Sequence, residues 1–430
     1  MTDERFATPR QSVRPSDETT RRPAGTGRRS GGAADAVRVL TILAHPDLRR
    51  IGDRVPLVEL DAGHGIELSR SKPELAPPDM VWHGRPLDDP YLSRQPWRLE
   101  ADGEGLVLHR QGSGLDVRVD GEGVIRRDDP AGTITVPAVA LDAGVSLILA
   151  DRVALWLHRL PTDAVAGPID REMVGASATL GEVLNSIERA ADLGVPVLLR
   201  GESGTGKELA ARALHARGRR PNGPFVAVNL GALSPTLAAS ELFGHTKGAF
   251  TGAIGKPGFF RAAEGGTLFL DEVGEAPTEV QAMLLRALEV GEIVPVGSHE
   301  PVPVDVRLIA ATDSDLEARV RRGDFKEPLL HRLSAYEIRL PALRERLDDL
   351  GRLFVHFAFR VLDEIGEGSR RGAPDADAPP WLPPDLIARL ARYPWPGNVR
   401  QLRNIVRQLV IDGRGEAQLR AGPRLEALLD

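Results

Sequence analysis

The residues from 201 to 208, GESGTGKE, combine glycines and a single lysine in the pattern G-x-x-x-x-G-K. Glycine leaves the backbone free to turn its N–H groups toward phosphate oxygens, and the helix predicted after the loop adds a positive N-terminus. Lys207 would then reach the β and γ phosphates. A strand-like run precedes the loop, so we expect a nucleotide phosphate site formed by Gly201, Glu202, Ser203, Gly204, Thr205, Gly206, Lys207 and Glu208.

Two acids follow the buried run TLFL, and they form the second candidate group. Ligands of open α/β sheets bind at the carboxyl edge of the strands, where Asp271 and Glu272 would emerge. Asp271 can hold Mg²⁺ through water, and Glu272 can polarise an attacking water as general base. Paired acids after a strand are often only a solvated turn, and the phosphate loop favours catalysis here. The Ser or Thr that usually follows the loop lysine is replaced by Glu208.

Phosphoryl transfer depends on positioning and charge neutralisation, so further cations and a γ-phosphate sensor are expected. Thr312 and Asp313 end another predicted strand near the same sheet edge. Lys326 and Arg332 lie in FKEPLLHRL, and Arg400 lies at the start of a predicted helix. A single arginine such as Arg332 or Arg400 would be a surface charge by default, and its position relative to the loop and the acids makes it a candidate.

The elements that must position these residues change character along the chain. Short apolar runs with turn signals predict an all-β sandwich over residues 37–160. Over 173–342, buried-strand runs alternate with helical periods, which predicts a parallel sheet covered on both faces, and a smaller helical subdomain follows over 343–412. The remaining segments are predicted as a disordered tail (1–36), a linker (161–172) and a short C-terminal tail (413–430).

Composition narrows the class of protein. The chain has 430 residues, of which 42% are hydrophobic, enough for several domains with sizeable cores. It has no cysteine, which excludes disulfides and thiol catalysis and fits a reducing, cytoplasmic location. No apolar run of 18 residues and no signal peptide are present, so we expect no membrane association. A net charge of -6 argues against a nucleic-acid footprint over the whole protein.

The segment ELFGHTKGAFTGA contains a glycine-rich stretch without charge and a single aromatic residue. It has too many glycines for a stable helix and too few apolar residues for a core strand. An exposed aromatic on a loop is more often a contact group than an accident. We therefore expect a binding loop whose tip consists of Gly248, Ala249, Phe250, Thr251, Gly252 and Ala253.

Residues from about 174 to 411 resemble the AAA+ domain of bacterial enhancer-binding proteins, the activators of sigma-54 RNA polymerase. GESGTGKE, ELFGHTKGAFTGA, GGTLFLDE and YPWPGNVRQLRN match that family in order, and a Glu after the loop lysine is usual there. The resemblance implies a cytoplasmic ATPase that uses ATP and Mg²⁺ and assembles as a ring, usually a hexamer. It implies that Phe250 and Thr251 contact sigma-54 in a movement coupled to ATP.

The resemblance also implies roles for the remaining candidates. Asn229 would pair with Glu272 as a switch that reports the γ-phosphate to the loop. Thr312 and Asp313 fall at the first sensor and Arg400 at the second. The trans-acting cations, which would reach the ATP site of a neighbouring protomer, correspond to Lys326 and Arg332.

Two positions depart from the family pattern and leave the hydrolysis rate open. Asp313 stands where Asn is common, and would put a carboxylate near the γ-phosphate. Lys326 stands where the family has Arg, and lysine lacks the bidentate fork. An alternative function is therefore an ATP-binding signalling adaptor with little or no hydrolysis, whose output is protein binding by the β domain.

The β region resembles a forkhead-associated (FHA) domain, a reader of phosphothreonine. Arg70 and the pair Ser93–Arg94 correspond to its phosphate-gripping residues, and such groups suit a phosphate. Pro96 replaces the usual histidine, and Asp116 lies close to where an Asn is expected. The resemblance implies a phosphoprotein or kinase partner. A sandwich used only for protein contact is the alternative.

Enhancer-binding proteins generally end in a helix-turn-helix, and only DGRGEAQLRAGPRLEALLD follows the last long predicted helix here. We therefore do not expect sequence-specific DNA binding. Activation from solution, tethering by a partner, and a truncated reading frame remain open explanations. RLEALLD allows one or two helical turns.

Overall fold

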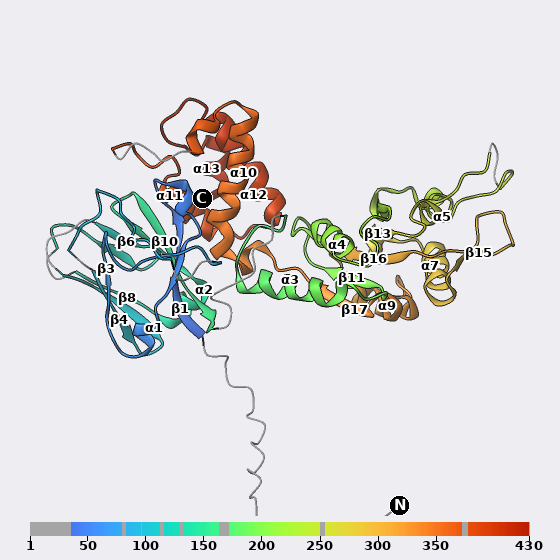
Figure 1. The fold of residues 1–430 in the computed structure, drawn as a ribbon, viewed down its shortest axis with the longest axis horizontal. Helices are drawn as coiled ribbons and strands as arrows, with labels where there is room; N and C mark the ends of the chain where they lie inside the picture. The colour runs from blue at the N-terminus through green and yellow to red at the C-terminus, as the bar shows by residue number, and fades with distance from the viewer. Residues whose placement is uncertain are drawn as a thin grey trace, which may run out of the picture. The chain divides into compact units, whose positions relative to one another are not determined.

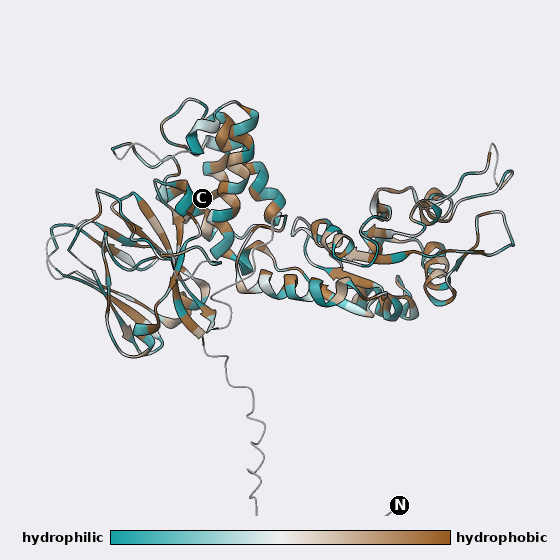
Figure 2. Cartoon of the chain, viewed as in Figure 1, coloured by the Kyte–Doolittle hydropathy of each residue, from teal (hydrophilic) through white to brown (hydrophobic). Residues whose placement is uncertain are grey.

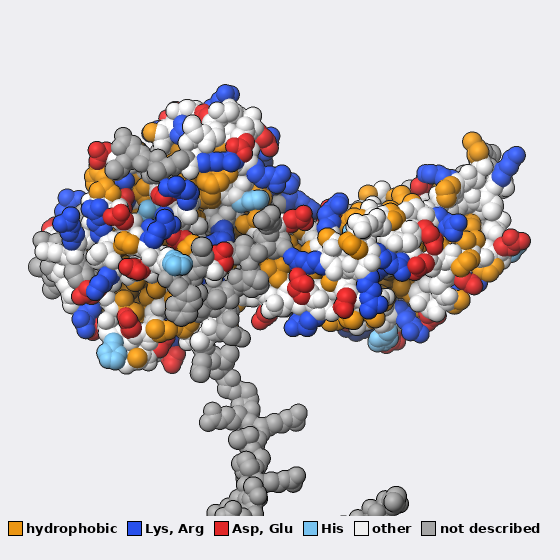
Figure 3. All heavy atoms as spheres, in the orientation of Figure 1, with side chains coloured by type: hydrophobic (Ala, Val, Ile, Leu, Met, Phe, Trp, Pro, Cys, Tyr) orange, Lys and Arg blue, Asp and Glu red, His pale blue; other side chains and the backbone are white. Residues whose placement is uncertain are grey.

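The computed structural model describes residues 36–79, 83–95, 97–111, 116–129, 132–162, 172–249, 254–371 and 377–429. Its strands form two antiparallel sheets in the N-terminal region and one parallel sheet in the region that follows (Figure 1). The predicted all-β region and the predicted α/β core are both confirmed at this level. Figure 3 shows basic and acidic side chains interspersed over the face in view.

The larger antiparallel sheet has the strand order β2-β1-β10-β9-β6-β7, and the smaller has the order β3-β4-β5-β8. Residues of both sheets share one apolar cluster, which makes the region a sandwich. The strands are β1 (Ala36–Ala44), β2 (Arg54–Pro56), β3 (Ile66–Leu68), β4 (Trp97–Asp102), β5 (Gly105–Arg110), β6 (Val117–Val119), β7 (Gly123–Ile125), β8 (Thr133–Val136), β9 (Val145–Leu149) and β10 (Val153–Pro161), with the short helices α1 (Val58–Asp61) and α2 (Ala138–Ala143).

Strands β4 and β5 alternate buried and more exposed residues, as expected for a sheet with one solvated face. By contrast, β1 is buried from its second residue to its last. Its outer face contacts helices α10 (Leu350–Glu364) and α11 (Pro384–Arg392), which lie far along the chain. The sandwich therefore shares its core with the C-terminal helices.

The parallel sheet has the order β12-β13-β16-β11-β17. Neighbouring residues along each strand point to opposite faces, so Leu198 joins one apolar cluster while Val197 and Leu199 join another. Both faces are thereby covered, which explains the near-continuous hydrophobic strands in Figure 2. The strands are β11 (Val197–Arg200), β12 (Phe225–Asn229), β13 (Thr267–Asp271), β16 (Arg307–Thr312) and β17 (Tyr336–Arg339), with a hairpin of β14 (Glu292–Ile293) and β15 (Val302–Pro303).

Helices cover this sheet and then form a helical subdomain, the lid. Helix α3 begins after Ser177, whose hydroxyl accepts a hydrogen bond from the amide of Leu180. No helix of the described residues is long and apolar enough to cross a membrane. The helices around the sheet are α3 (Ala178–Ala191), α4 (Lys207–Ala216), α5 (Pro235–Phe243), α6 (Phe259–Ala262), α7 (Thr278–Val290), α8 (Leu316–Arg322) and α9 (Glu327–Leu333), and the lid consists of α10, α11, α12 (Asn398–Asp412) and α13 (Pro423–Leu429).

Candidate functional site

The phosphate loop connects the end of β11 to the first residue of α4. Gly204 and Gly206 have φ angles of 82° and 105°, which favour glycine. A Cβ on Gly204 would lie 2.5 Å from the carbonyl oxygen of Gly397 in the lid, so the loop and the lid approach as closely as glycine allows. Lys207 is buried, and its Nζ donates to the carbonyl oxygens of Gly201 at 2.7 Å and Glu202 at 3.3 Å.

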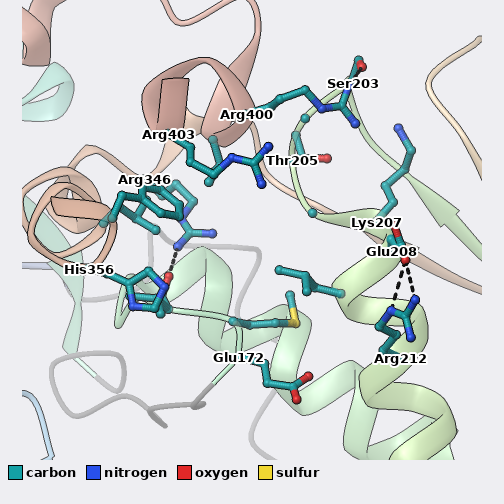
Figure 4. A pocket seen from close by; sticks show the side chains of 18 of the residues that line it. Glu172, Ser203, Thr205, Lys207, Glu208, Arg212, Arg346, His356, Arg400 and Arg403 are labelled. Carbon is teal, nitrogen blue, oxygen red and sulfur yellow. Dashed lines mark hydrogen bonds and ion pairs between the residues drawn. The ribbon is translucent and has the colours of Figure 1, made fainter. Parts of the chain in front are cut away.

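A cavity of about 610 Å³ opens beside this loop. The structure brings Lys207, Asp271, Glu272 and Arg400 together among its lining residues, although they come from three separate parts of the chain. Figure 4 shows Lys207 and Arg400 on the loop side of the cavity, with Arg346 and His356 across from them. Five basic lining residues were not predicted from the sequence, and they are Arg212, Arg346, His356, Arg360 and Arg403.

The acidic pair lies at the carboxyl end of β13, as its sequence position predicts. Glu272 has a φ of 56°, and its amide donates to Asp271 Oδ1 at 3.1 Å. Burial raises the pKa of Glu272, and the neighbouring carboxylates of Asp313 and Asp271 raise it further. Asn229 was expected to pair with Glu272, but in this conformation its Nδ2 lies 3.4 Å from Asp271 Oδ2.

Strand β16 pairs with β11 and delivers Thr312 to the base of the phosphate loop. The carbonyl of Thr312 accepts a hydrogen bond from the amide of Gly201 at 3.2 Å, and its side chain is buried. Thr312 and Asp313 line a separate pocket of about 170 Å³ together with Gly201 and Glu202. Asp313 therefore reaches the acidic pair from the side of the sheet and not from the main cavity.

Lid residues at the start of α12 close over the loop. Arg400 donates from Nη1 to the hydroxyl of Ser203 at 3.0 Å. Asn398 is fully buried and was not predicted as a site residue, yet its Nδ2 lies 3.0 Å from Glu202 Oε2 and 3.1 Å from the carbonyl of Ser203. Arg344 also binds Glu202, and Arg344 and then Asn398 lower the pKa of that carboxyl to about 2.

The other unpredicted basic residues follow helical spacing. Arg403 is three residues after Arg400 on α12, and Arg360 is four residues after His356 on α10, so each pair shares one helix face. Burial, with the charge of Arg360, lowers the pKa of His356. This periodicity was the available signal for these residues, but it acquires meaning only once the two helices are known to face the cavity.

Three candidates stand apart from the interior of this cavity. Glu208 lines it, but its carboxylate pairs with Arg212 one helical turn later at 2.7 Å. Lys326 and Arg332 are not among the lining residues; Arg332 is exposed and lies 3.3 Å from Glu289 on α7. Within a single chain, therefore, the structure does not bring these two cations to the phosphate loop.

The expected binding loop is described only at its base. Phe250, Thr251, Gly252 and Ala253 lie outside the described residues. His245 pairs with Lys256 across the two sides of the base, and Thr246 donates from its amide to the carbonyl of Val296 near the β14–β15 hairpin. Ile254, directly after the tip, is 87% exposed.

In the sandwich, the structure brings together two of the three predicted phosphate-gripping residues. Arg70 and Ser93 line a small pocket of about 10 Å³ with Asp116, whereas Arg94 is exposed and is not among the lining residues. The amide of Arg70 donates to the carbonyl of Ser93 at 3.0 Å. The Arg70 guanidinium lies 3.1 Å from Asp88, so a carboxylate already occupies part of its donor fork. Pro96 lies outside the described residues.

Comparisons with known proteins match the region that holds the cavity. Residues 173–339 match the model of the sigma-54 interaction domain family, and residues 344–419 match that of the AAA+ ATPase lid domain. The chain is 47% identical over 253 residues to the DNA-binding transcriptional regulator NtrC of Azospirillum brasilense, covering 58% of this chain and 50% of that protein. NtrC of Salmonella typhimurium is 46% identical over 256 residues, with 59% and 52% covered.

Solved structures match a similar share of the chain. NtrX from Brucella abortus in complex with ADP superposes with a TM-score of 0.51 at 38% identity, covering 56% of this chain and 51% of that one. The complex of NtrX with ATP gives a TM-score of 0.51 at 38% identity, with 57% and 54% covered. The chain spans about half the length of the curated relatives it matches. Residues 173–419 of this chain are therefore similar to a sigma-54 interaction domain followed by an AAA+ ATPase lid domain, and to the matching part of NtrC-type regulators.

Proposed function

We propose that this protein is an ATP-dependent transcriptional activator that engages sigma-54 RNA polymerase through residues 248–253 and remodels the closed promoter complex by ATP hydrolysis. The observation that carries the proposal is the single cavity that joins Lys207, the acidic pair and Arg400. These groups supply a phosphate cradle, a base and a lid cation, which are the parts that phosphoryl transfer requires.

Each residue acts by position and charge. Lys207, at the N-terminus of α4, binds the β and γ phosphates of ATP, and Arg400 adds a second cation from the lid. Glu272 orients and deprotonates the attacking water, while Thr312, Asp313 and Asn229 sense the γ-phosphate. The half-buried carboxylate of Asp271 at the strand end fits Mg²⁺, which takes one or two carboxylates together with water and phosphate oxygens. Bound Mg²⁺ would neutralise phosphate charge.

Lys326 and Arg332 act on the cavity of a neighbouring protomer in a ring. Neither residue lines the cavity of its own chain, which supports this arrangement. A cation that acted on ATP in its own protomer would have to line that cavity. The base of the binding loop packs beside the β14–β15 hairpin, and its exposed Ile254 supports a contact surface that continues through the tip.

The sandwich acts as an FHA-like reader of phosphothreonine, through Arg70 and Ser93, with Arg94 at the edge of the site. The presence of Arg70 and Ser93 in the lining of one pocket supports this role. A phosphate has to displace Asp88 from Arg70, so binding a phosphoprotein or kinase partner would exchange an internal ion pair for an intermolecular one.

The test of the ATPase is steady-state hydrolysis over a protein concentration series, with Glu272→Gln as the matched variant. Specific activity should rise cooperatively with concentration, because active sites are completed between protomers, and should vanish in the variant. Tight ATP binding without turnover at any concentration would refute the proposed ATP-driven activator. The signalling adaptor would then be the remaining candidate.

The polymerase contact is tested separately with Thr251→Ala at the loop tip. This variant should keep ATP hydrolysis but lose open-complex formation by sigma-54 polymerase on a supercoiled promoter. The control is Lys256→Ala, at the base of the loop, where the lysine side chain pairs with Glu241 at 3.2 Å. Equal open-complex formation by Thr251→Ala and the parent protein would contradict the proposed contact.

The second candidate, an adaptor that binds ATP but hardly hydrolyses it, is favoured by one observation. Burial, and after it the adjacent carboxylate of Asp313, raises the pKa of the proposed base Glu272, so the base stays protonated to higher pH than an ordinary glutamate. If Lys326 is also a weakened trans-acting cation, Lys326→Arg should raise ATPase activity at equal assembly. No change, or a fall, would remove that explanation.

A further inference from the structure

The segment from 172 to 177 contributes one wall of the nucleotide cavity through its first three residues. Glu172, Met173 and Val174 line it, and the apolar side chains of Leu353 and Phe357 on α10 line the same cavity. An apolar wall at a distance from the phosphate loop suits the flat base of a nucleotide. The position of this segment should therefore affect nucleotide affinity, although it contributes no phosphate-binding group.

The backbone of this wall is held by side chains from outside it. Asp349 Oδ1 accepts hydrogen bonds from the amides of Ala176 at 2.5 Å and Ser177 at 3.1 Å. Arg346 Nη2 donates to the carbonyl of Val174 at 2.7 Å and is oriented by Asp349, 2.9 Å away. These two residues precede α10 and belong to the ATPase region itself.

A third hydrogen bond reaches the wall from the sandwich. Arg54, on strand β2, donates from Nη1 to the carbonyl of Ala176 at 3.0 Å, in a buried setting. Its side chain is 2% exposed, and its backbone is fixed by two hydrogen bonds with Ala76 of 2.7 and 3.0 Å. Burial, helped by the charge of Arg54, holds the pKa of nearby His158 at about 3, so Arg54 provides the positive charge at this point.

We infer that Arg54 is a positioning residue of the nucleotide cavity: by holding the carbonyl of Ala176 it fixes the wall formed by residues 172–177, so that attachment of the sandwich and binding of nucleotide favour each other. This rests on the proposed function of the cavity as an ATP site. The coupling is reciprocal, because a ligand that prefers the fixed wall must also stabilise the contacts that fix it.

The close fit around Arg54 supports a rigid connection. A Cβ added to Gly351 of α10 would lie 2.7 Å from the carbonyl of Leu43 on β1, so helix and strand are in direct backbone contact. Two residues later, Leu353 on the same helix lines the cavity. The sandwich thus contacts the nucleotide wall directly through Arg54 and also contacts α10, which lines the same cavity.

The test measures ADP binding to the full chain by calorimetry, with Arg54→Met compared with Arg152→Met. Arg152 is a matched control, because it too is a buried sandwich arginine that donates to a backbone carbonyl of the C-terminal region, that of Ala378 at 3.0 Å, away from the cavity. We expect the Kd for ADP to rise about tenfold in Arg54→Met, in the usual range of coupling between sites, and to stay within about twofold of the parent value in the control.

Kinetics separate positioning from catalysis. In Arg54→Met the KM for ATP should rise while kcat stays nearly unchanged, and Arg54→Lys, which keeps one donor, should recover part of the affinity. Equal affinity in Arg54→Met and the parent protein would overturn the inference. Absence of ADP binding in the parent protein would instead refute the proposed function.

Hydrogen–deuterium exchange on the parent protein keeps the inference testable if Arg54→Met fails to fold. ADP should slow exchange at the amides of Ala176 and Ser177 and also at those of Arg54 and Ala76 in the sandwich. The hairpin β6–β7, at the far edge of the larger sheet from β2, should be unaffected. Protection of the wall without protection at Arg54 and Ala76 would overturn the inference.

Discussion

The two phosphate sites proposed for this chain are built in different ways. In the nucleotide cavity, a glycine loop, the N-terminus of α4 and Lys207 are supplied by one contiguous stretch, and about 610 Å³ of space lies beside them. In the sandwich, Arg70 and Ser93 come from separate segments, the pocket is about 10 Å³, and Asp88 already pairs with the arginine. A preformed cradle needs little rearrangement to bind, whereas the sandwich site must first break an internal ion pair.

The largest effect is expected from Lys207→Ala, which should weaken ATP binding by about 100-fold, or about 2.8 kcal/mol. The loop would lose the charged group that donates hydrogen bonds to the phosphates. Binding of a phosphothreonine peptide by the sandwich should be unchanged in this variant. Calorimetry with each ligand on the same preparation checks both statements. Loss of both activities would mean that the two sites are not independent and that the comparison between them fails.

A smaller effect, about tenfold, is expected at the sandwich site and should depend on which partner of the ion pair is changed. Asp88→Asn should tighten binding of a phosphothreonine peptide, because the guanidinium of Arg70 no longer has to leave a carboxylate. Arg70→Ala should instead weaken binding by about tenfold, because the phosphate loses its guanidinium partner. Fluorescence anisotropy with matched phosphorylated and unphosphorylated peptides measures both.

The control is Asp47→Asn, at an ion pair with Arg49 elsewhere in the sandwich, which should leave peptide affinity unchanged. If Asp88→Asn weakens binding, the carboxylate supports the site, and the competition described above is wrong.

The same contrast explains what could be predicted from the sequence. The parallel sheet was predictable because β11, β13 and β16 are short hydrophobic runs, each bounded by turns, and the phosphate loop was predictable because its glycines and Lys207 are contiguous. The acidic pair needed only one further step, since parallel strands end at the same edge of a sheet.

Residues that act through tertiary contact were missed. Asn398 has a φ of 50° and holds both Glu202 and the loop backbone, but in the sequence it is simply an Asn after a Gly. Arg54 reads as an ordinary strand residue until β2 is placed against Ala176. Asn229 was expected to pair with Glu272, but its partner in this conformation is Asp271, because the choice between adjacent carboxylates depends on side-chain directions that spacing does not determine.

A change of several-fold in ATPase activity is expected at the three neighbouring carboxylates of Asp271, Glu272 and Asp313. Asp313→Asn removes one of the charges that raise the pKa of Glu272, so the proposed base stays ionised to lower pH. The acidic limb of the profile of kcat/KM against pH should shift to lower pH, and activity at pH 6 should rise more than activity at pH 8. An unchanged limb, with activity altered equally at all pH values, would mean that Asp313 acts by position alone. Asp315→Asn, at the N-cap of α8, is the nearby control.

The smallest effect concerns the junction that supports the cavity wall. Burial and the adjacent Asp349 raise the pKa of Asp348 to about 7, against the opposing charges of Arg54 and Arg346. A carboxyl whose pKa is higher in the folded than in the unfolded protein binds more protons when folded, so the free energy of unfolding falls as pH rises from about 4 to 7. Asp348→Asn removes this dependence and should raise Tm by a few degrees at pH 8 but hardly at pH 4.

Thermal unfolding over this pH range, with Asp385→Asn at an exposed ion pair as control, measures the difference. An increase in Tm that is the same at every pH would show that Asp348 destabilises through packing and not through charge. If Tm increases with a dependence on pH, and only in Asp348→Asn, then ionisation of Asp348, next to Arg54, costs the folded protein stability. Because the charge of Arg54 lowers this pKa, the attraction between Arg54 and the ionised carboxylate would then grow with rising pH, while burial and Asp349 account for the loss of stability.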